Sequence, residues 1–521
     1  MPIVYPGVSR LLDLPQRWLD RDCLKSAAGS LSFAQTRDGM LRVAQWLTSA
    51  ADVRIGDCVA ICLPKSLESV LLIYGIHAAG AAYVPLPQGG PSLRLGNILR
   101  AIKPRLFIAT SEATSQWAAV DPSQPVAPLQ IVDPLPDGRG LDRLLQGMAP
   151  AHDIPTRGAR DLAAIMLTSG STGEPKGVMR AHDSVPMLSW LAPGEISPDE
   201  RFISTSALNY TSSHDVFFPV IGGCSTYLAS EREAMFPDRI AHLLAHERAT
   251  TWVTTATALR LLLENDQLRQ HDLGNLRRVR VAGEPLHPDL LRRIMAAIPQ
   301  AAFVNIYGAT EAPTMLWFDV PRPLPEDMES VPLGKPSSNF EVRLCNDEGA
   351  AVGPGEIGEI CAIGGPLLLG YWGDPILTAA KRLPGLPASY RTGDFGRLGE
   401  DGLIYSAGRA DDLVKLRGHR FALGEIEAVL RVHRQVREAA AFATVDLRGE
   451  SEICAAILVQ GDGPPEGELR QLCLERLPAY ARPARIERFK DFPLLTSGKI
   501  DRSALRASVL AAVKAGSSAN S

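Results

Sequence analysis

The chain has 521 residues, of which 45% are hydrophobic and 21% charged, and its formal net charge is −4. These proportions are typical of globular protein and leave room for more than one domain. A slightly acidic chain gives no electrostatic reason to expect nucleic-acid binding.

The beginning of the chain and its cysteines bear on location. Residues 1–5 contain neither a basic nor an apolar stretch, so export is not expected. The most apolar stretch, 70–86, is interrupted by glycine, histidine and proline, which predicts a core helix leading into a strand rather than a membrane span. The eight cysteines are scattered without a C-x-x-C pair, which favours reduced thiols over disulfides or zinc. We therefore expect a cytoplasmic protein without a membrane partner.

Helical and strand-like patterns alternate up to about residue 319. Helical spacing is expected at 31–51, 67–79 and 93–102, and apolar runs predict strands at 58–63, 82–86 and 106–109. Alternation of this kind predicts α/β layers with mainly parallel strands. The interval 121–161 is rich in Pro, Asp and Gly, which predicts a long connection.

A stretch rich in glycine and hydroxyl groups, 167–177, follows an apolar run at 162–167 that predicts a buried strand. Because glycine has no Cβ, a strand entering such a turn brings backbone N–H groups close to a ligand. The hydroxyls add donors, and Lys176 adds a charge suited to phosphate oxygens. The Walker pattern does not fit, because glycine follows the lysine. The stretch predicts a phosphate loop, and a flexible surface loop is the alternative.

This stretch resembles, nearly residue for residue, the phosphate loop of the AMP-forming adenylation enzymes. That superfamily contains acyl-CoA synthetases, luciferases and the adenylation domains of non-ribosomal peptide synthesis. Further segments match its pattern in the expected order, at 281–285, 305–311, 390–394, 408–412, 414–427 and 496–502. The resemblance covers nearly the whole chain and is closest to free-standing peptide-synthetase adenylation domains, because of 390–397 and 414–427.

The resemblance implies an α/β fold in two parts. The large N-terminal part would consist of layered α/β subdomains with mainly parallel sheets, and the small C-terminal part would be a mobile α+β domain. The corresponding boundaries are 1–408 for the large ATP- and acid-binding domain, 409–412 for a hinge, 413–510 for the lid domain and 511–521 for a frayed tail.

ATP and Mg²⁺ are the cofactors that the resemblance implies. The phosphate loop would contribute Thr168, Ser169, Gly170, Ser171, Thr172, Gly173 and Lys176, and the other nucleotide contacts would be Gly283, Glu284, Tyr307, Gly308, Asp394, Arg409 and Lys415. Tyr307 offers a ring to stack on a purine, and Asp394 can accept from both ribose hydroxyls. Glu311, next to Thr310, offers a hard carboxylate oxygen to magnesium.

The implied reaction has two halves. A carboxylate attacks the α-phosphorus of ATP and pyrophosphate leaves; a thiol then attacks the acyl-adenylate and AMP leaves. Because the reactants of the first half are both anionic, positioning and cationic stabilisation are the main tasks. Lys499 would be the central cation, with Thr310 and Glu311 as the other catalytic residues. Between the halves the small domain would rotate about Asp411, with Asp412 as the alternative hinge.

No carrier-like serine motif follows Arg502, so we expect the acceptor to be the phosphopantetheine thiol of a separate carrier protein. Coenzyme A, as in acyl-CoA ligases, is the alternative. Two readings outside acid–thiol ligation also stay open. One is a non-catalytic nucleotide-binding scaffold, against which the presence of Lys499, Glu311 and Asp394 argues. The other is oxidative use of an acyl-adenylate, as in luciferases.

The small carboxylic acid substrate is suggested by a departure from the family pattern. Where adenylation domains for α-amino acids have a Phe-Asp pair whose aspartate binds the α-ammonium, this chain has Leu208 and Asn209. Asn209-Tyr210 resembles instead the aryl-acid branch, in which the amide contacts a ring hydroxyl. Alignment of flanking motifs adds Ser213, His214, Asp215, Thr254, Arg280, Ala282, Ile306, Thr314 and Met315 to the pocket.

We therefore expect an aryl or polar-substituted acid rather than a standard α-amino acid. A buried unpaired guanidinium is costly, so Arg280 either pairs with a protein carboxylate such as Asp215 or awaits an anionic or carbonyl group of the ligand. Asp215 could also bind a displaced amine, which leaves a β-amino or unusual amino acid open.

Overall fold

The computed structural model describes residues 7–88, 92–118, 128–133, 140–169, 175–185, 196–409, 413–416, 419–445, 451–459, 461, 463–477, 482–494, 500–502 and 504–509. The chain forms two compact units, one of residues 1–343 and 361–391, the other of 344–360 and 392–521. The second unit thus includes 344–360 and 392–408, which the sequence prediction assigns to the large part. The expected hinge residue Asp411 and the expected tail lie outside the described residues.

The first unit contains a seven-stranded sheet, in the order β18-β8-β7-β4-β3-β5-β6. Its strands are β3 (Cys58–Cys62), β4 (Ala82–Pro85), β5 (Leu106–Ala109), β6 (Leu129–Ile131), β7 (Leu162–Ser169), β8 (Pro175–Ala181) and β18 (Gly370–Tyr371). Neighbours from β7 to β6 pair in parallel, whereas β8 pairs antiparallel with β7 and β18. The helices of this region are α1 (Phe33–Ser49), α2 (Leu67–Ala78), α3 (Ser92–Ile102), α4 (Ser111–Ala118) and α5 (Gly140–Leu144).

The core of this region is dense where α1 meets α2. Both helices begin at a serine capping box, Ser32 with Gln35 in α1 and Ser66 with Ser69 in α2, which satisfies exposed N–H groups of the first turn. The helices approach closely at Gly75, where an added Cβ would lie 2.2 Å from Cγ1 of Val43. Glycine is therefore required there by the separation of the helices.

The first unit also contains a nine-stranded sheet, in the order β15-β14-β13-β12-β11-β9-β10-β1-β2. Its strands are β1 (Asp22–Ser26), β2 (Gly29–Ser32), β9 (Arg201–Ser204), β10 (Ser225–Leu228), β11 (Thr251–Thr254), β12 (Arg278–Ala282), β13 (Ala302–Ala309), β14 (Ala312–Asp319) and β15 (Lys335–Pro336). The six central strands are parallel, and the strands at both edges are antiparallel. The mainly parallel α/β fold expected from the sequence is confirmed.

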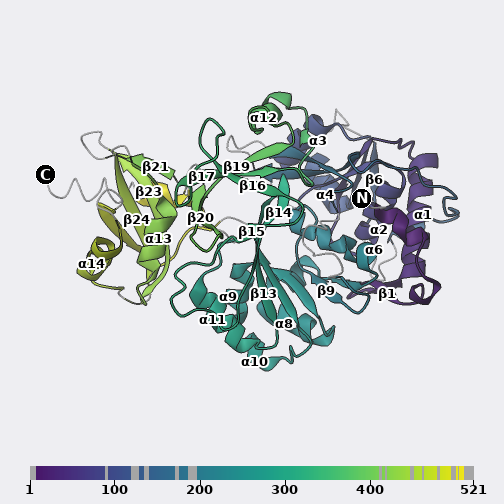
Figure 1. Cartoon of the computed structure of the whole chain (residues 1–521). Helices are drawn as coiled ribbons and strands as arrows, with labels where there is room; N and C mark the ends of the chain where they lie inside the picture. Colours follow the sequence, from purple (N-terminus) through teal and green to yellow (C-terminus); the bar gives the residue numbers. More distant parts are fainter. Residues whose placement is uncertain are drawn as a thin grey trace. The chain divides into compact units, whose positions relative to one another are not determined.

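Short helices pack beside this sheet. They are η1 (Gly7–Leu12), η2 (Gln16–Trp18), η4 (Thr211–Phe217), α6 (Phe218–Gly222), α7 (Glu231–Met235), α8 (Pro237–His246), α9 (Ala256–Glu264), α10 (Gln267–Gln270) and α11 (Pro288–Ala297). Figure 1 shows α8 to α11 gathered around β13 in the teal part of the chain. α12 (Pro375–Ala380) follows β18.

A four-stranded sheet, β16-β17-β19-β20, contains the positions at which the chain passes between the units. Its strands are β16 (Glu341–Cys345), β17 (Ile357–Ile363), β19 (Ser389–Leu398) and β20 (Ile404–Arg409). The rest of the second unit consists of the β21 (Leu413–Leu416) and β22 (His419–Ala422) hairpin, α13 (Leu423–Arg431), α14 (Glu466–Arg476), and a sheet of β23 (Val436–Val445), β24 (Ser451–Val459) and β25 (Arg485–Phe489).

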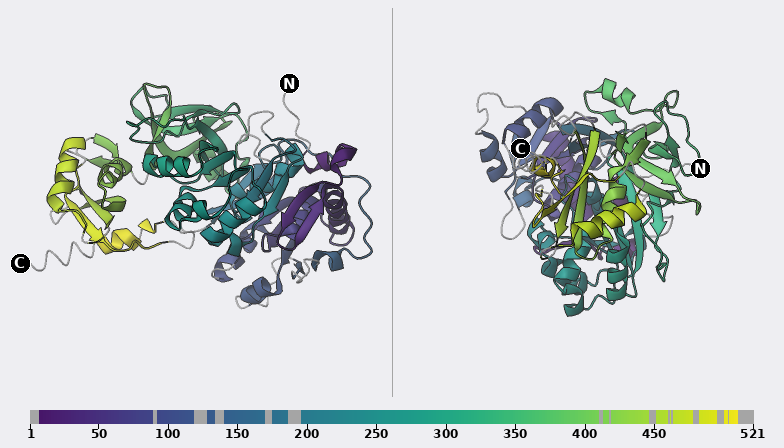
Figure 2. Two further views of the ribbon diagram at one scale, coloured as in Figure 1. Left: turned by 90° about the horizontal axis from the view of Figure 1, so that it is seen from below. Right: turned by 90° about the vertical axis from the view of Figure 1, so that its left-hand side faces the viewer.

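The three-stranded sheet has a core on each face. One face packs against α13 and α14 through Ile426, Leu430 and Leu469. Figure 2 shows these helices beside the strands in the yellow-green part of the chain. The other face packs against Phe492, Leu505 and Val509. The small α+β part expected from the sequence is confirmed.

Two local expectations differ from the structure. Residues 29–32 pair as β2, so the first long helix begins at 33 rather than 31. The expected connection at 121–161 contains β6 and α5. All eight cysteines carry free, buried thiols. Within the described residues, no helix is long and apolar enough to cross a membrane, and no cluster of three or more His, Cys, Asp or Glu side chains could hold a metal ion.

Candidate active site

The glycine-rich stretch joins β7 to β8. The two strands pair antiparallel, with Thr168 opposite Lys176 and Ser169 opposite Pro175. β7 and β8 are therefore antiparallel neighbours that flank the stretch, and Thr168 and Lys176 are paired near the ends of these strands. Gly170, Ser171, Thr172 and Gly173 lie outside the described residues.

The turn between β13 and β14 is held from three directions. The Thr211 hydroxyl, at the start of η4, donates to the Thr310 hydroxyl at 2.9 Å. The guanidinium of Arg180, on β8, donates to the Thr310 carbonyl, and the Tyr371 hydroxyl donates to Oε1 of Glu311 at 2.8 Å. Arg180 is completely buried and also binds Ser184. The turn that carries both predicted catalytic residues is thus fixed by side chains distant in sequence.

Charge explains why these contacts persist at neutral pH. Burial, and then the neighbouring Glu311 carboxylate, raise the pKa of both Tyr371 and Tyr390, so the two phenols keep their protons. Burial lowers the pKa of Arg180 only to about 10, so the guanidinium stays charged. Glu311 therefore lies among proton donors and a cation. A single carboxylate of this kind suits Mg²⁺, which binds one or two carboxylates together with substrate phosphates.

The return from β13 to β14 requires unusual backbone. A Cβ on Gly308 would lie 2.3 Å from the backbone nitrogen of Thr314, so only glycine fits. Thr314 itself has φ +51°, in the left-handed region that a β-branched residue rarely adopts. Backbone strain of this kind clusters at functional sites. It supports the inclusion of Thr314 in the acid pocket.

His214 is the most distinctive member of the predicted acid pocket. The side chain is completely buried on η4, and its ring lies 6.5 Å from that of Tyr83 and 6.3 Å from that of Phe217, between centroids. Neither ring nitrogen has a hydrogen-bond partner within the described part of the chain. Burial, and then the charge of Arg180, hold its pKa well below the usual range. His214 is therefore a neutral imidazole whose donor and acceptor can both serve a ligand.

Two buried hydroxyls of the predicted pocket also lack a hydrogen-bond partner among the residues that the structure describes, those of Thr254 and Thr314.

Sheet register assigns other pocket residues to the two faces of the nine-stranded sheet. Ala282 pairs with Ile306, and Arg280 lies two residues before Ala282, so these three share one face of the sheet. Thr254 pairs with Val281 and belongs to the opposite face, at the end of β11.

Arg280 is completely buried, and its guanidinium lies 5.6 Å from the centre of the Trp317 ring, where a cation–π attraction offsets part of its desolvation. Asp215 has other partners. It accepts from the Ser204 hydroxyl at 2.7 Å, and the principal charge acting on it is that of Lys65.

The Lys65 ammonium is itself buried. It donates to the carbonyls of Ser204 at 2.6 Å and Ser206 at 2.9 Å, just before the predicted acid-binding residues. Burial raises the pKa of Asp215 and lowers that of Lys65, and each charge opposes the shift of the other. The two groups, together with the Ser204 hydroxyl, fix the strand end that leads to Asn209.

The other predicted residues of the first unit have varied surroundings. Asn209 is half-buried and Tyr210 is 51% exposed, while Met315 is buried. The Ser213 hydroxyl donates to the Leu208 carbonyl at 3.0 Å, closing its own turn. Glu284 accepts from the Thr257 N–H at 2.8 Å, at the start of α9, and Gly283 has φ +81° in the turn after β12. Tyr307 is half-buried near the end of β13.

In the second unit, Asp394 pairs with Arg409 across β19 and β20, so the two predicted ribose-binding residues lie opposite each other. The N–H of Gly393 donates to Glu359 at 2.9 Å, which fixes the backbone beside Asp394. Lys415 lies on β21. Lys499 lies outside the described residues.

Sequence reasoning missed Lys65, Arg180 and Tyr371. Each is a polar residue in or beside an apolar strand, and this placement could have marked it as a residue with a buried partner. Lys65 follows β3, and Arg180 interrupts the apolar part of β8. Their partners are 130 or more residues away in two cases and 60 in the third, so no local pattern connects them.

Comparison with protein-family models matches residues 13–372 to the family described as AMP-binding enzyme, and residues 425–499 to the AMP-binding enzyme C-terminal domain. The chain is 34% identical over 512 residues to phenyloxazoline synthase MbtB of Mycobacterium tuberculosis, a match of 96% of this chain and 34% of that protein. It is 31% identical over 513 residues to tyrocidine synthase 2 of Brevibacillus parabrevis, a match of 96% and 14% respectively.

The chain thus spans about a third or less of the length of these relatives. Among solved structures, ATP-bound MatB from Rhodopseudomonas palustris resembles it with a TM-score of 0.85 at 26% identity, over 96% of this chain and 98% of the other.

Proposed function

The chain belongs to the AMP-binding enzyme family, and from this premise we propose that it activates a carboxylic acid with ATP and passes the acyl group to the phosphopantetheine thiol of a separate carrier protein. The observation that carries the proposal is the β13–β14 turn, where Thr310 and Glu311 are fixed by Arg180, Thr211 and Tyr371. Such rigid positioning of a carboxylate suits phosphoryl chemistry, in which orientation and charge stabilisation dominate.

Each part of the nucleotide has proposed contact residues in this chain. Thr168 and Lys176 would hold the β- and γ-phosphates together with the backbone of 170–173, and Tyr307 would stack on the adenine. Glu311 would hold Mg²⁺, which neutralises phosphate oxygens when bound. Asp394 would accept from the ribose hydroxyls, and Lys499 would stabilise charge at the α-phosphate. The ATP-bound relative MatB supports ATP as the nucleotide.

For the acid, we propose an aryl or polar-substituted carboxylic acid. Asn209 replaces the carboxylate that would bind an α-ammonium, and a buried ammonium without a carboxylate partner loses several kcal/mol of hydration. Asp215 is the other carboxylate that could bind a substrate amine, and its charge is already balanced by that of Lys65. The neutral imidazole of His214 and the hydroxyls of Thr254 and Thr314 instead offer hydrogen bonds to an uncharged substituent.

For the acceptor, we propose a carrier protein rather than coenzyme A. The support is the peptide-synthetase-like segment 414–427 and the higher identity to the two synthases, 34% and 31%, than to MatB, 26%. We also propose a cytoplasmic location, because eight free thiols suit a reducing compartment.

Acid-dependent ATP–pyrophosphate exchange, measured over a panel of aryl acids, hydroxy acids, β-amino acids and the standard α-amino acids, tests the proposal. Exchange should be fastest with an aryl or hydroxy-substituted acid. Fastest exchange with a standard α-amino acid would overturn the acid class, and exchange with no acid would favour the scaffold. The preferred acid should then label a phosphopantetheinylated carrier, and efficient release of acyl-CoA without carrier labelling would reverse the assignment of the acceptor.

A further inference from the structure

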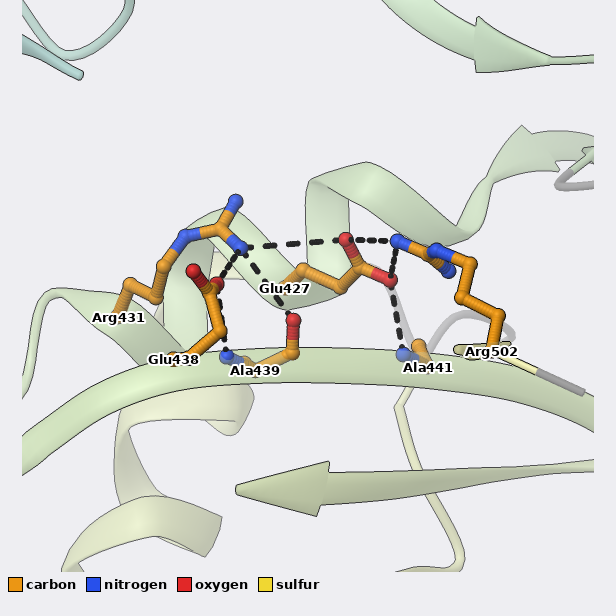
Figure 3. A network of polar contacts seen from close by, with 6 residues as sticks. All are labelled: Glu427, Arg431, Glu438, Ala439, Ala441 and Arg502. Atoms are coloured by element: carbon orange, nitrogen blue, oxygen red, sulfur yellow. Dashed lines mark hydrogen bonds and ion pairs between the residues drawn. The ribbon is translucent and has the colours of Figure 1, made fainter. Parts of the chain in front are cut away.

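A polar network in the second unit centres on a buried carboxylate, Glu427 of α13 (Figure 3). This side chain is only 6% exposed. One guanidinium nitrogen, Nη2 of Arg502, donates to both carboxylate oxygens, at 2.8 and 2.9 Å. The N–H of Ala441, on β23, donates to Oε1 at 2.9 Å. The Glu427 carboxylate thereby links Arg502 to α13 and to β23.

The second arginine of the network, Arg431, lies closer to another carboxylate than to Glu427. Arg431, one turn further along α13, lies 3.9 Å from Glu427 but only 2.8 Å from Glu438. Burial raises the pKa of Glu427, and Arg502 is the strongest of the groups that oppose the shift. Arg502 is therefore the principal counter-ion of Glu427, whereas Arg431 lies closer to Glu438 than to Glu427.

Arg502 lies just after residues 495–499, which contain Lys499. The two flanking residues, Leu494 and Ile500, form an isolated antiparallel bridge. The N–H of Asp501 donates to the Pro493 carbonyl at 2.8 Å, and the Asp501 side chain accepts from the N–H of Ala504 at 2.9 Å. The described residues on either side of 495–499 are thus paired with each other, and the ion pair with Glu427 links Arg502 to α13 and β23.

We propose that Glu427 and Arg502 are positioning residues whose ion pair sets the placement of Lys499 for the adenylation step. The inference rests on the role proposed for Lys499. A flexible lysine is effective only where the residues around it fix its backbone, and a misplacement of about 1 Å can cost roughly 10²-fold in rate. Arg502 is three residues from Lys499 in the sequence, so its contact with Glu427 restrains the chain close to the lysine that we propose to be catalytic.

Glu427→Gln keeps the shape of the side chain and removes its charge. We expect kcat for acid-dependent pyrophosphate exchange to fall roughly 10²-fold, with little change in KM for ATP or acid. Thioester formation from preformed acyl-adenylate should be retained. Arg502→Lys, which keeps the charge, should lose less than Arg502→Met. In the Lys499→Ala background, Glu427→Gln should cause no additional loss.

Glu438→Gln is the matched control, because it breaks an ion pair in the same network but leaves Arg502 on Glu427. It should lower thermal stability without a selective loss of exchange. Near-normal exchange in Glu427→Gln, or equal losses in both half-reactions, would overturn the proposal.

Amide hydrogen exchange supplies a readout that needs no activity. Glu427→Gln should reduce protection at Asp501 and Ala504, and Glu438→Gln should not. Unchanged protection at these two amides in Glu427→Gln would overturn the positioning role. If the wild-type chain exchanges no pyrophosphate, yet Glu427→Gln selectively loses protection at these amides, the proposed function is refuted while this anchoring stays in place.

Discussion

Replacement of Lys65 by methionine tests the buried charge pair beneath the predicted acid pocket. Methionine retains most of the apolar length of lysine and removes the ammonium. The carbonyls of Ser204 and Ser206 then lose their donor, at distances that are now 2.6 and 2.9 Å, and Asp215 loses its balancing charge.

The expected cost is large. A buried acceptor left without its donor costs about 1–3 kcal/mol, and a buried charge left without its partner about 3–5 kcal/mol. These effects overlap, because one nitrogen serves all three groups and Asp215 can take up a proton. We therefore expect Lys65→Met to lower the free energy of unfolding by about 3–5 kcal/mol near neutral pH. Adding Asp215→Asn should recover much of this loss.

The penalty should also depend on pH. The pKa of Asp215 is already raised by burial, and without Lys65 it should rise further. A folded-state carboxyl with a raised pKa stabilises the protein at acidic pH, and this contribution is lost as pH rises from about 4 through the folded pKa. The Lys65→Met penalty should therefore be smaller at acidic than at neutral pH.

Urea unfolding of the two single variants and the double variant, at acidic and neutral pH, measures these differences. The strand end before Asn209 should also loosen, so KM for the acid should rise more than KM for ATP. Strictly additive effects of Lys65→Met and Asp215→Asn, or a penalty independent of pH, would show that the two groups do not compensate each other.

Three further outcomes are expected. Gly75→Ala should lower the free energy of unfolding by about 1–3 kcal/mol, measured from the urea midpoint, since the added Cβ would overlap Val43. Adding Val43→Ala, which shortens the opposing side chain, should recover part of this loss, and no recovery would contradict the contact. Tyr371→Phe removes the donor to Glu311 and should raise the Mg²⁺ concentration for half-maximal exchange roughly 10-fold, whereas an unchanged Mg²⁺ titration would detach Glu311 from the metal. His214→Leu should reduce exchange with a polar-substituted acid by roughly 10- to 100-fold relative to its unsubstituted analogue, and equal losses with both would remove His214 from recognition.

Local pattern was sufficient for much of the fold. The helix expected at 67–79 is Leu67–Ala78, and the strand expected at 58–63 is Cys58–Cys62, because each is an apolar run whose period matches its structure. The helix expected from 31 begins instead at Phe33, since Ser32 serves as its cap and 29–32 pair as a strand. Pairing with a distant strand is not visible in local spacing.

The site divides in the same way. Thr310, Glu311 and Thr168 could be predicted as site residues because their motifs are contiguous in sequence. Lys65, Arg180 and Tyr371 escaped detection because each acts through a contact made only in the folded chain. The pairing of Asp215 with Lys65 likewise depends on tertiary structure. The Asp215 carboxylate accepts from Ser204 and is balanced by the charge of Lys65.

Acyl-adenylate is the product on which the proposed function depends, and a single-turnover experiment measures it directly. Excess enzyme is mixed with ATP, Mg²⁺ and the preferred acid from the exchange panel, quenched in acid, and analysed by mass spectrometry. We expect acyl-AMP and pyrophosphate in equal amounts in the wild-type chain, and a loss of about 10²–10³ in their rate of formation in Lys499→Ala. ATP consumption without acyl-AMP would show that the chain does not form an acyl-adenylate, and an unchanged rate in Lys499→Ala would remove Lys499 from the adenylation step.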